Sequence, residues 1–247
     1  MTSNASHADQ IRDHLHRVAA LRARAGDAPD LMTAVRTVKR LQARRFRSTY
    51  ADLARQARSE LAVRFFLDEL YGEHDFSRRD EQFGRIAGAL ERLFPAAVGQ
   101  LAVDLAEIHA LTERLDHALA SHWLALPDGL SDAERYVQAW RLCSARDERQ
   151  RQLAVVQHMG QELQRLTRMR SLRLGLRMMR KPAEAAGLDA LQHFLENGFD
   201  AFAALGDASS FLQTIDERET QWIGILFDAP LSDASHRLDE EMSRASP

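Results

Sequence analysis

Apolar residues recur at spacings of three and four along nearly the whole chain, and strict alternation of apolar and polar residues is almost absent. This period is that of amphipathic α-helices, whereas half-buried strands would alternate. We therefore predict an all-α fold, a multi-helix bundle with one or two very long helices. The predicted helices span residues 7–25, 30–47, 50–58, 60–71, 78–94, 96–126, 132–180, 188–205 and 208–227.

Helix boundaries are indicated by capping residues, glycines and prolines. A Ser or Thr followed three residues later by Asp or Glu is typical of a helix start, because the side-chain oxygen can accept a hydrogen bond from a free backbone N–H. Four such pairs occur, at Ser6/Asp9, Thr49/Asp52, Ser77/Asp80 and Ser131/Glu134. Helix ends are predicted at Gly26 and Gly72 and ahead of Pro95, Pro127 and Pro182.

The two longest predicted helices organise the bundle. Residues 96–126 carry a continuous stripe of apolar residues, which predicts a central helix. Residues 132–180 would span about 75 Å as one helix, although a compact domain of this size is only about 45–50 Å across. This helix must break, most simply within 144–152, or project. A projecting helix would bury its apolar stripe from Leu153 to Leu166 on a second subunit, which makes a homodimer the default expectation.

The chain length and the distribution of proline and glycine favour one domain. No linker rich in proline or glycine divides the 247 residues, and the hydrophobic content of 45% is enough for a sizeable core. We predict a single helical domain over residues 1–227 and a polar, disordered tail over 228–247.

The cysteine content and the absence of long apolar runs indicate the compartment. Cys143 is the single cysteine and cannot form an intrachain disulfide. The N-terminal residues are polar where a signal peptide would be apolar, and no run approaches the ~18 apolar residues of a membrane span. These features predict a cytoplasmic protein without a membrane partner. Because all basic residues except Lys39 and Lys181 are arginines, we expect a bacterial source with GC-rich DNA.

Charge is divided strongly along the chain. Residues 1–64 and 141–181 carry net charges of +7 and +8, whereas residues 65–140 and 182–247 carry −8 and −10, which together give the net charge of −3. Basic blocks that pack beside acidic ones would cancel most of this asymmetry inside the molecule. Alternatively, the arginines share a face that meets an acidic partner or nucleic acid. Few aromatic residues lie among them, so platforms for stacking bases are scarce.

The segment FFLDELYGEHDFSRRDEQFGRI, residues 65–86, combines aromatic residues with closely spaced acidic and basic ones. Asp75 and Asp80 flank the start of a predicted helix, where negative charge is favourable, and Arg79 can bridge either carboxylate. This predicts a clamp that fixes a corner of the fold. The alternative is a pocket for an anion or another small molecule, lined by Phe65, Phe66 and Tyr71, with an arginine as the partner of the ligand.

A second distinctive segment, LRLGLRMMRKPAEAAGLDALQHFLENGFDAF, covers residues 172–202. Its apolar residues, among them Met179 and Phe194, are predicted to lie in the core. Arg177 and Arg180 would share one side of a helix just before a proline, where cations favour the helix dipole or could bind an anion. Together with Arg141 they form the candidate binding surface of the Arg-rich region 141–181.

These two segments resemble those of a family of uncharacterised bacterial proteins. The resemblance covers about residues 49–219, and it implies no reaction, cofactor or partner because the family has none assigned.

Other chemistry finds little support. On the helix 96–126, His109, Glu113, Asp116 and His117 imitate metal ligands, but the row lies about 80–100° from the leucine stripe and is predicted to face the border or the solvent. His193 alone is weak evidence for a haem ligand. Neither a nucleophile motif nor a glycine-rich phosphate loop occurs. We predict no catalytic residue, metal or cofactor.

The sequence favours a non-enzymatic binding or regulatory protein that uses its Arg-rich helical surface to meet a protein partner or a second copy of itself. The second interpretation is a bundle with an enclosed pocket for a small ligand or haem, lined by residues 65–72 and with enzymatic activity left open. Nucleic-acid binding comes third.

Overall fold

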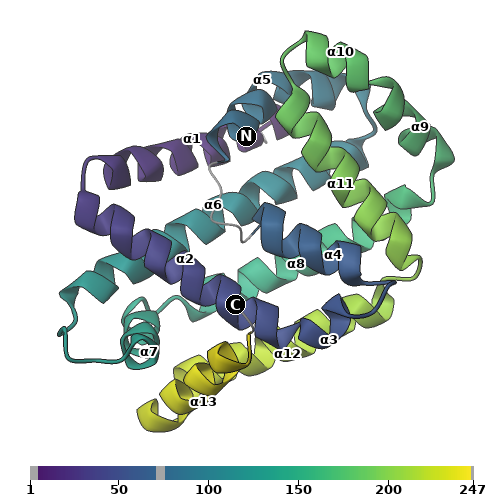
Figure 1. Cartoon of the computed structure of the whole chain (residues 1–247). Coiled ribbons are helices and arrows are strands. Elements are labelled where there is room, and N and C mark those ends of the chain that lie inside the picture. The colour runs from purple at the N-terminus through teal and green to yellow at the C-terminus, as the bar shows by residue number, and fades with distance from the viewer. Residues whose placement is uncertain (1–4, 71–75, 246–247) are drawn as a thin grey trace.

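The computed structural model describes residues 5–70 and 76–245, and all regular structure in these ranges is helical (Figure 1). The prediction of an all-α, multi-helix fold is therefore confirmed. The helices are α1 His7–Gly26, α2 Pro29–Thr49, α3 Ala51–Ala54, α4 Glu60–Phe65, the π-helix η1 Phe66–Leu70, α5 Ser77–Leu93, α6 Ala96–Ala125, α7 Asp132–Leu142, α8 Arg146–Thr167, α9 Arg170–Met178, α10 Arg180–Ala185, α11 Asp189–Leu205, α12 Ser209–Asp228 and α13 Leu231–Arg244. No helix in the described part is long and apolar enough to cross a bilayer.

Helix α6 is the central element. It is 30 residues long and packs against α1, α2, α5, α7 and α8, so that nearly every side of it meets another helix (Figure 1). Leu115 and Leu119 are fully buried in this position. Along its apolar stripe, Ile108 packs with Val155 and Val156 of α8, whereas Leu119 lies in the apolar cluster shared with α2 and α7.

The segment 132–180 is broken rather than projecting. Helix α7 ends at Leu142, and Ser144 adopts a positive φ of 49°, which redirects the chain into α8. Helix α8 then packs against α6 and α12, and its residues Val156 and Leu166 are buried within the chain. The predicted break is found at its expected start. The apolar stripe of α8 consequently gives no reason for a second subunit.

The prediction of a disordered tail over residues 228–247 is wrong. Residues Leu231–Arg244 form α13, which packs against α2 and α7. Ala234, Leu238 and Met242 are spaced by four and are all buried, so they form an apolar stripe within an otherwise polar sequence. Polarity had suggested disorder, whereas the period of these three residues indicates a helix.

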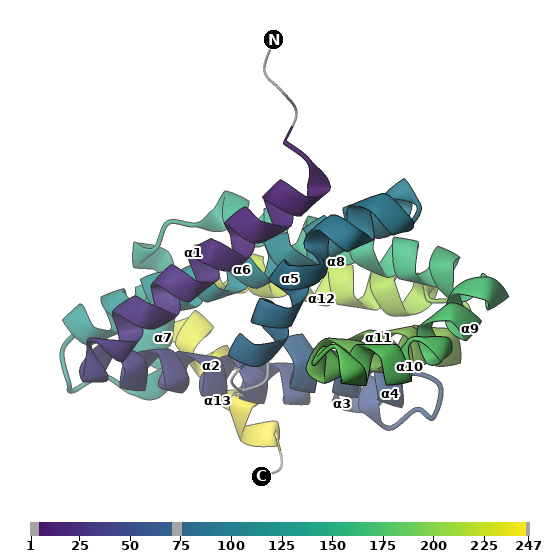
Figure 2. The same ribbon diagram turned by 90° about the horizontal axis from the view of Figure 1, so that it is seen from above.

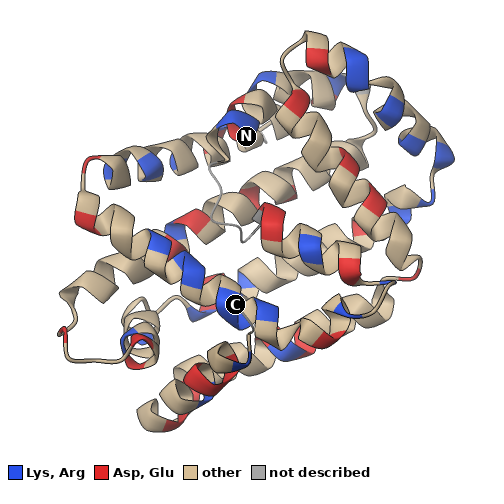
Figure 3. Ribbon diagram, in the orientation of Figure 1, with Lys and Arg blue, Asp and Glu red and all other residues tan. Residues whose placement is uncertain are grey.

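Acidic and basic blocks of the sequence meet in space, as Figure 3 shows for the charged positions on neighbouring helices. Arg45 pairs with Glu219 at 2.8 Å, and Arg151 with Glu107 at 2.7 Å. Three further pairs join the basic block 141–181 to the acidic block 182–247, namely Arg146–Asp228, Arg173–Asp200 and Arg180–Glu196. Two other pairs link distant helices without reducing the asymmetry, namely Arg78–Asp189 and Arg218–Asp52. Much of the charge asymmetry along the chain is therefore cancelled by pairing within the fold.

Candidate functional site

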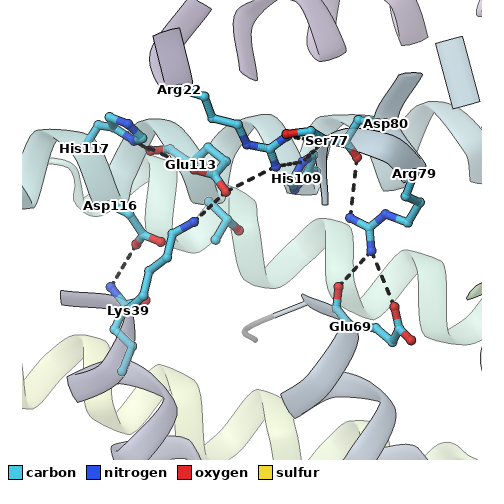
Figure 4. Close-up of polar contacts among 12 residues, drawn as sticks. Arg22, Lys39, Glu69, Ser77, Arg79, Asp80, His109, Glu113, Asp116 and His117 are labelled. Atoms are coloured by element: carbon cyan, nitrogen blue, oxygen red, sulfur yellow. Dashed lines mark hydrogen bonds and ion pairs between the residues drawn. The ribbon is translucent and has the colours of Figure 1, made fainter. Parts of the chain in front are cut away.

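Asp80 stands at the junction of three helices. It lies in the first turn of α5, and its Oδ2 accepts a hydrogen bond from Arg22 of α1 at 2.8 Å. The same oxygen is 2.8 Å from Nε2 of His109 on α6, and the side chain is only 10% exposed (Figure 4). Burial alone would raise the pKa of Asp80, but the hydrogen bond and charge of His109 and the neighbouring arginines lower it.

Arg79 extends this junction toward η1 and α11. Its Nη1 donates to the backbone oxygen of Glu69 at 3.0 Å and lies 3.6 Å from the carboxylate of the same residue. Its guanidinium also covers the rings of Phe76 and Phe194, at 4.2 and 4.7 Å from their centroids. Arg79 and Asp80 are both buried and lie 3.6 Å apart. Together they tie α5 to its neighbours on both sides.

The polar row on α6 is buried, so its predicted position at the border of the bundle is wrong. Glu113, Asp116 and His117 are all less than 7% exposed, because α2 covers this side of α6. Lys39 of α2 donates to Glu113 at 2.6 Å, and Arg22 lies 3.8 Å from the same carboxylate (Figure 4). Burial would raise the pKa of Glu113, but Lys39 and its other cationic neighbours lower it.

This polar network has the contacts of a clamp. The space beside Asp80 and His109 is about 10 Å³, which is the room one water molecule needs. Within the described residues no group of three or more His, Cys, Asp and Glu side chains is arranged to hold a metal ion. Asp80, Arg79 and Glu113 each lie near an opposite charge, whereas Asp116 accepts a hydrogen bond from the neutral Gln42 at 2.9 Å. The arrangement ties α1, α2, α5 and α6 to one another, and among the described residues the space beside it is no larger than a water molecule needs.

The other predicted site residues do not join this network. Phe66 packs against Phe202 and Phe211 with ring centroids 6.4 and 6.1 Å away. Tyr71 and Asp75 lie outside the described residues. Arg141 donates to the backbone oxygens of Leu226 and Ala229 at the end of α12. These positions serve separate parts of the fold.

Arg177 and Arg180 lie on the periphery, on α9 and α10 beside α11 (Figure 2). Arg180 donates through Nε to both carboxylate oxygens of Glu196, at 2.7 and 2.8 Å. Arg177 is exposed and, within the described residues, has neither an ion pair nor a side-chain hydrogen bond. The two arginines are three positions apart, but Arg180 is held by an ion pair with Glu196, whereas Arg177 has no ion pair within the described residues.

Helix α9 contains no buried residue, although it is strongly amphipathic in sequence. Leu174 is 61% exposed, Met178 is 70% exposed, and Met179 is 47% exposed. The prediction of Met179 as a core residue is therefore wrong. Leu172 and Leu176 face the body of the molecule instead, and both are half-buried. Sequence reasoning also missed Leu174 and Met178, although their spacing of four places them together on one side of the helix.

We call the exposed part of residues 170–181 the α9–α10 surface. Besides its apolar residues it carries Arg170, Arg177 and Lys181, which have no ion pair within the described chain. Arg173 and Arg180 are held by Asp200 and Glu196 of α11 at 2.9 and 2.7 Å. The surface thus combines unpaired cations, ion-paired cations and exposed apolar side chains.

Comparison with known proteins gives one finding. Neither the curated proteins nor the solved structures contain a match to the chain. A family model described as a domain of unknown function, DUF8198, matches residues 21–233. This match covers most of the chain and includes both segments on which the resemblance to an uncharacterised family rests. The chain belongs to the family of this domain of unknown function, DUF8198.

Proposed function

We propose that the protein is a non-enzymatic binding protein whose α9–α10 surface docks a protein partner that presents acidic and apolar side chains. The observation that carries the proposal is that α9 buries none of its residues, while Leu174 and Met178 project into solvent beside unpaired arginines. Large apolar side chains gathered on one exposed helix face are a frequent mark of an interaction site.

The energetics of such docking divide between the two kinds of side chain. Covering Leu174 and Met178 would gain about 1–2 kcal/mol for each, given how much of each side chain is now exposed. Arg170, Arg177 and Lys181 would add attraction for acidic groups, which mainly speeds association and selects the partner. In protein interfaces, buried apolar side chains usually supply most of the affinity, and charged side chains at the edge guide association.

The local acidic residues favour a protein over a lipid surface or a nucleic acid. Glu196 and Asp200 lie in the same surface and would be repelled by a continuous sheet or chain of phosphates. No aromatic residue occurs between positions 168 and 181 on which a base could stack. A folded partner can place its acidic groups opposite the free cations and leave these two carboxylates alone.

We test the proposal with a photocrosslinking residue placed at Leu174 in the full chain, in cells of the source organism. We expect one partner protein to be crosslinked through a segment that contains acidic and apolar residues. The double variant Arg170→Glu/Arg177→Glu should reduce the adduct at least tenfold without changing the thermal unfolding temperature, because neither side chain has a partner in the fold.

The matched control reverses two exposed arginines elsewhere. Arg36 and Arg44 lie on the solvent side of α2, so Arg36→Glu/Arg44→Glu changes the net charge equally and should leave the adduct intact. Equal loss in both double variants would show that overall charge, not the α9–α10 surface, governs capture. An adduct with phospholipid or nucleic acid, or no adduct at all, would contradict the proposal.

Two further expectations belong to this proposal. A crosslink between two copies would identify the partner as the chain itself and make the surface a homodimer interface. We infer a bacterial, cytoplasmic setting because Cys143 is a lone thiol and the chain is so rich in arginine.

A further inference from the structure

An internal cavity of about 70 Å³ lies between α2, α7, α8 and α12. Three of the apolar side chains that line it are Phe66, Val156 and Ile215, which we call the apolar wall. Arg149 and Trp140 also line it, and we call these two side chains the polar wall. Most of the lining residues are buried. The cavity is separate from both the clamp around Asp80 and the α9–α10 surface.

Arg149 is the unusual residue of the polar wall. It is only 7% exposed, and its guanidinium stacks on the ring of Trp140 at 4.0 Å from the centroid. Its only side-chain hydrogen bond within the described residues goes to Oε1 of Gln152, at 3.2 Å. No carboxylate in the described part lies within 4.0 Å of it. Asp116 interacts with Arg149 electrostatically but forms no ion pair with it, and its carboxylate accepts from Gln42 at 2.9 Å.

A second arginine that lines the same cavity has its charge compensated by a carboxylate. Arg45 is also buried, at 6% exposure, but both of its terminal nitrogens donate to Glu219, at 2.9 and 2.8 Å. The hydroxyl of Tyr50 donates to the same carboxylate at 2.7 Å. The contrast leaves Arg149 as a buried cation whose charge is not matched by an ion pair.

The indole of Trp140 adds an independent observation. Its Nε1 is buried and has no hydrogen-bond partner, although Trp140 lines the cavity. Gln152 is already engaged on both sides, because its oxygen accepts from Arg149 and its nitrogen donates to Thr112 at 2.7 Å. The polar wall therefore presents N–H donors whose hydrogen-bonding capacity is not used within the described residues.

A buried cation and an unpaired buried donor are both costly, and an anion in contact with them would offset the cost. We propose that the cavity binds a short-chain aliphatic carboxylate, with its carboxylate group against Arg149 and Nε1 of Trp140 and its alkyl group against Phe66, Val156 and Ile215. The planar fork of a guanidinium matches a carboxylate in shape, and the apolar wall matches a hydrocarbon.

The size of the cavity limits the ligand. One water molecule needs roughly 10–15 Å³ of such space, so the cavity of about 70 Å³ has room for a molecule of about five to seven non-hydrogen atoms. Acetate and propionate satisfy this limit, whereas hexanoate exceeds it. A neutral amide of the same size, propionamide, fits the space but lacks the charge.

The test is isothermal titration calorimetry of the full chain with sodium propionate, with sodium chloride, propionamide and sodium hexanoate as controls. We expect propionate to bind saturably, with one molecule per chain. Sodium chloride, propionamide and hexanoate should show no binding. Heats for propionate that equal those for chloride would overturn the proposal and show that the cavity holds only water.

Two variants locate the site. Arg149→Met keeps the shape of the side chain and removes its charge, so it should abolish propionate binding while leaving the ligand-free protein at least as stable. Trp140→Phe removes the unpaired donor and should weaken binding about tenfold or more at little cost in folding. If Arg149→Met does not fold, Trp140→Phe decides: unchanged propionate affinity in that variant would contradict the assignment.

Discussion

Replacing Asp80 by alanine should destabilise the protein far more than the loss of an ordinary surface charge. The carboxylate receives two short contacts, both of 2.8 Å, from Arg22 and His109, and its side chain is 10% exposed. Removing one member of a buried ion pair leaves the others uncompensated and typically costs about 3–5 kcal/mol. We expect the free energy of unfolding of Asp80→Ala to fall by that amount.

The assay is urea denaturation followed by far-UV circular dichroism, with thermal unfolding as a second measure. For a chain of 247 residues, a loss of about 3–5 kcal/mol corresponds to a fall in Tm of roughly 6–20 °C. The matched control is Asp13→Ala, which removes the same carboxylate from an exposed pair with Arg17 on α1. Exposed pairs contribute little, so this variant should lose less than about 1 kcal/mol.

The pH dependence gives an independent check of the same reasoning. The pKa of Asp80 is lowered in the folded protein, so its contribution is complete above the pKa of the unfolded chain and is lost as pH falls through the folded pKa. The difference in stability between the wild-type protein and Asp80→Ala should therefore be largest above about pH 4 and shrink below it. A loss no greater than that of Asp13→Ala, or a difference that grows on acidification, would refute the buried clamp.

Two other predictions concern packing. A Cβ at Gly160 would overlap the side chain of Leu212, so Gly160→Ala should push α8 from α12 and lower the free energy of unfolding by about 1–2 kcal/mol. A Cβ at Gly175 on α9 would meet no neighbour within 4 Å, so Gly175→Ala should raise the free energy of unfolding by up to about 1 kcal/mol. Equal effects of the two changes in urea denaturation would contradict the close approach of α8 and α12. Leu238→Ala should lower the free energy of unfolding by about 2–5 kcal/mol, because this side chain on α13 is fully buried. If a chain without α13 were as stable as the full chain in urea denaturation, α13 would not be part of the core.

Local signals in the sequence predicted helix boundaries when the partner of the capping group was itself local. Ser6 accepts from the backbone of Asp9, and Ser131 forms a complete capping box with Glu134. The same pattern at Ser77 and Asp80 has a different role. Helix α5 begins at Ser77, and Asp80 turns to Arg22, a residue 58 positions earlier in the chain. A contact between residues so far apart in the chain cannot be predicted from the local sequence pattern.

The burial of the polar row on α6 could not be predicted for a related reason. One apolar stripe on a helix identifies one covered side, and Glu113 lies away from that stripe. It becomes buried because α2 packs over it and brings Lys39 to within 2.6 Å. The pattern of a single helix does not contain the position of a second helix, so the charged interior of the bundle was visible only in the structure.

The breaks in the segment 132–180 decide which arginines are available for binding. The turn at Ser144 folds α8 back onto the bundle, where Arg149 becomes buried and Arg151 pairs with Glu107. The second break, after α8 ends at Thr167, carries α9 to the periphery, where its main contacts in the described part of the chain are with α8, α10 and α11.

A helix of nine residues has little stability of its own, so α9 depends on the contacts of its inner side with α11. Its outer side, with Leu174 and Arg177, contributes nothing to those contacts. The exposure of Leu174 and Met178 on this outer side is the observation on which the proposed docking surface rests. The segment 132–180 thus contributes one buried cation, Arg149, to the cavity and unpaired cations to the α9–α10 surface, and the two breaks separate these positions.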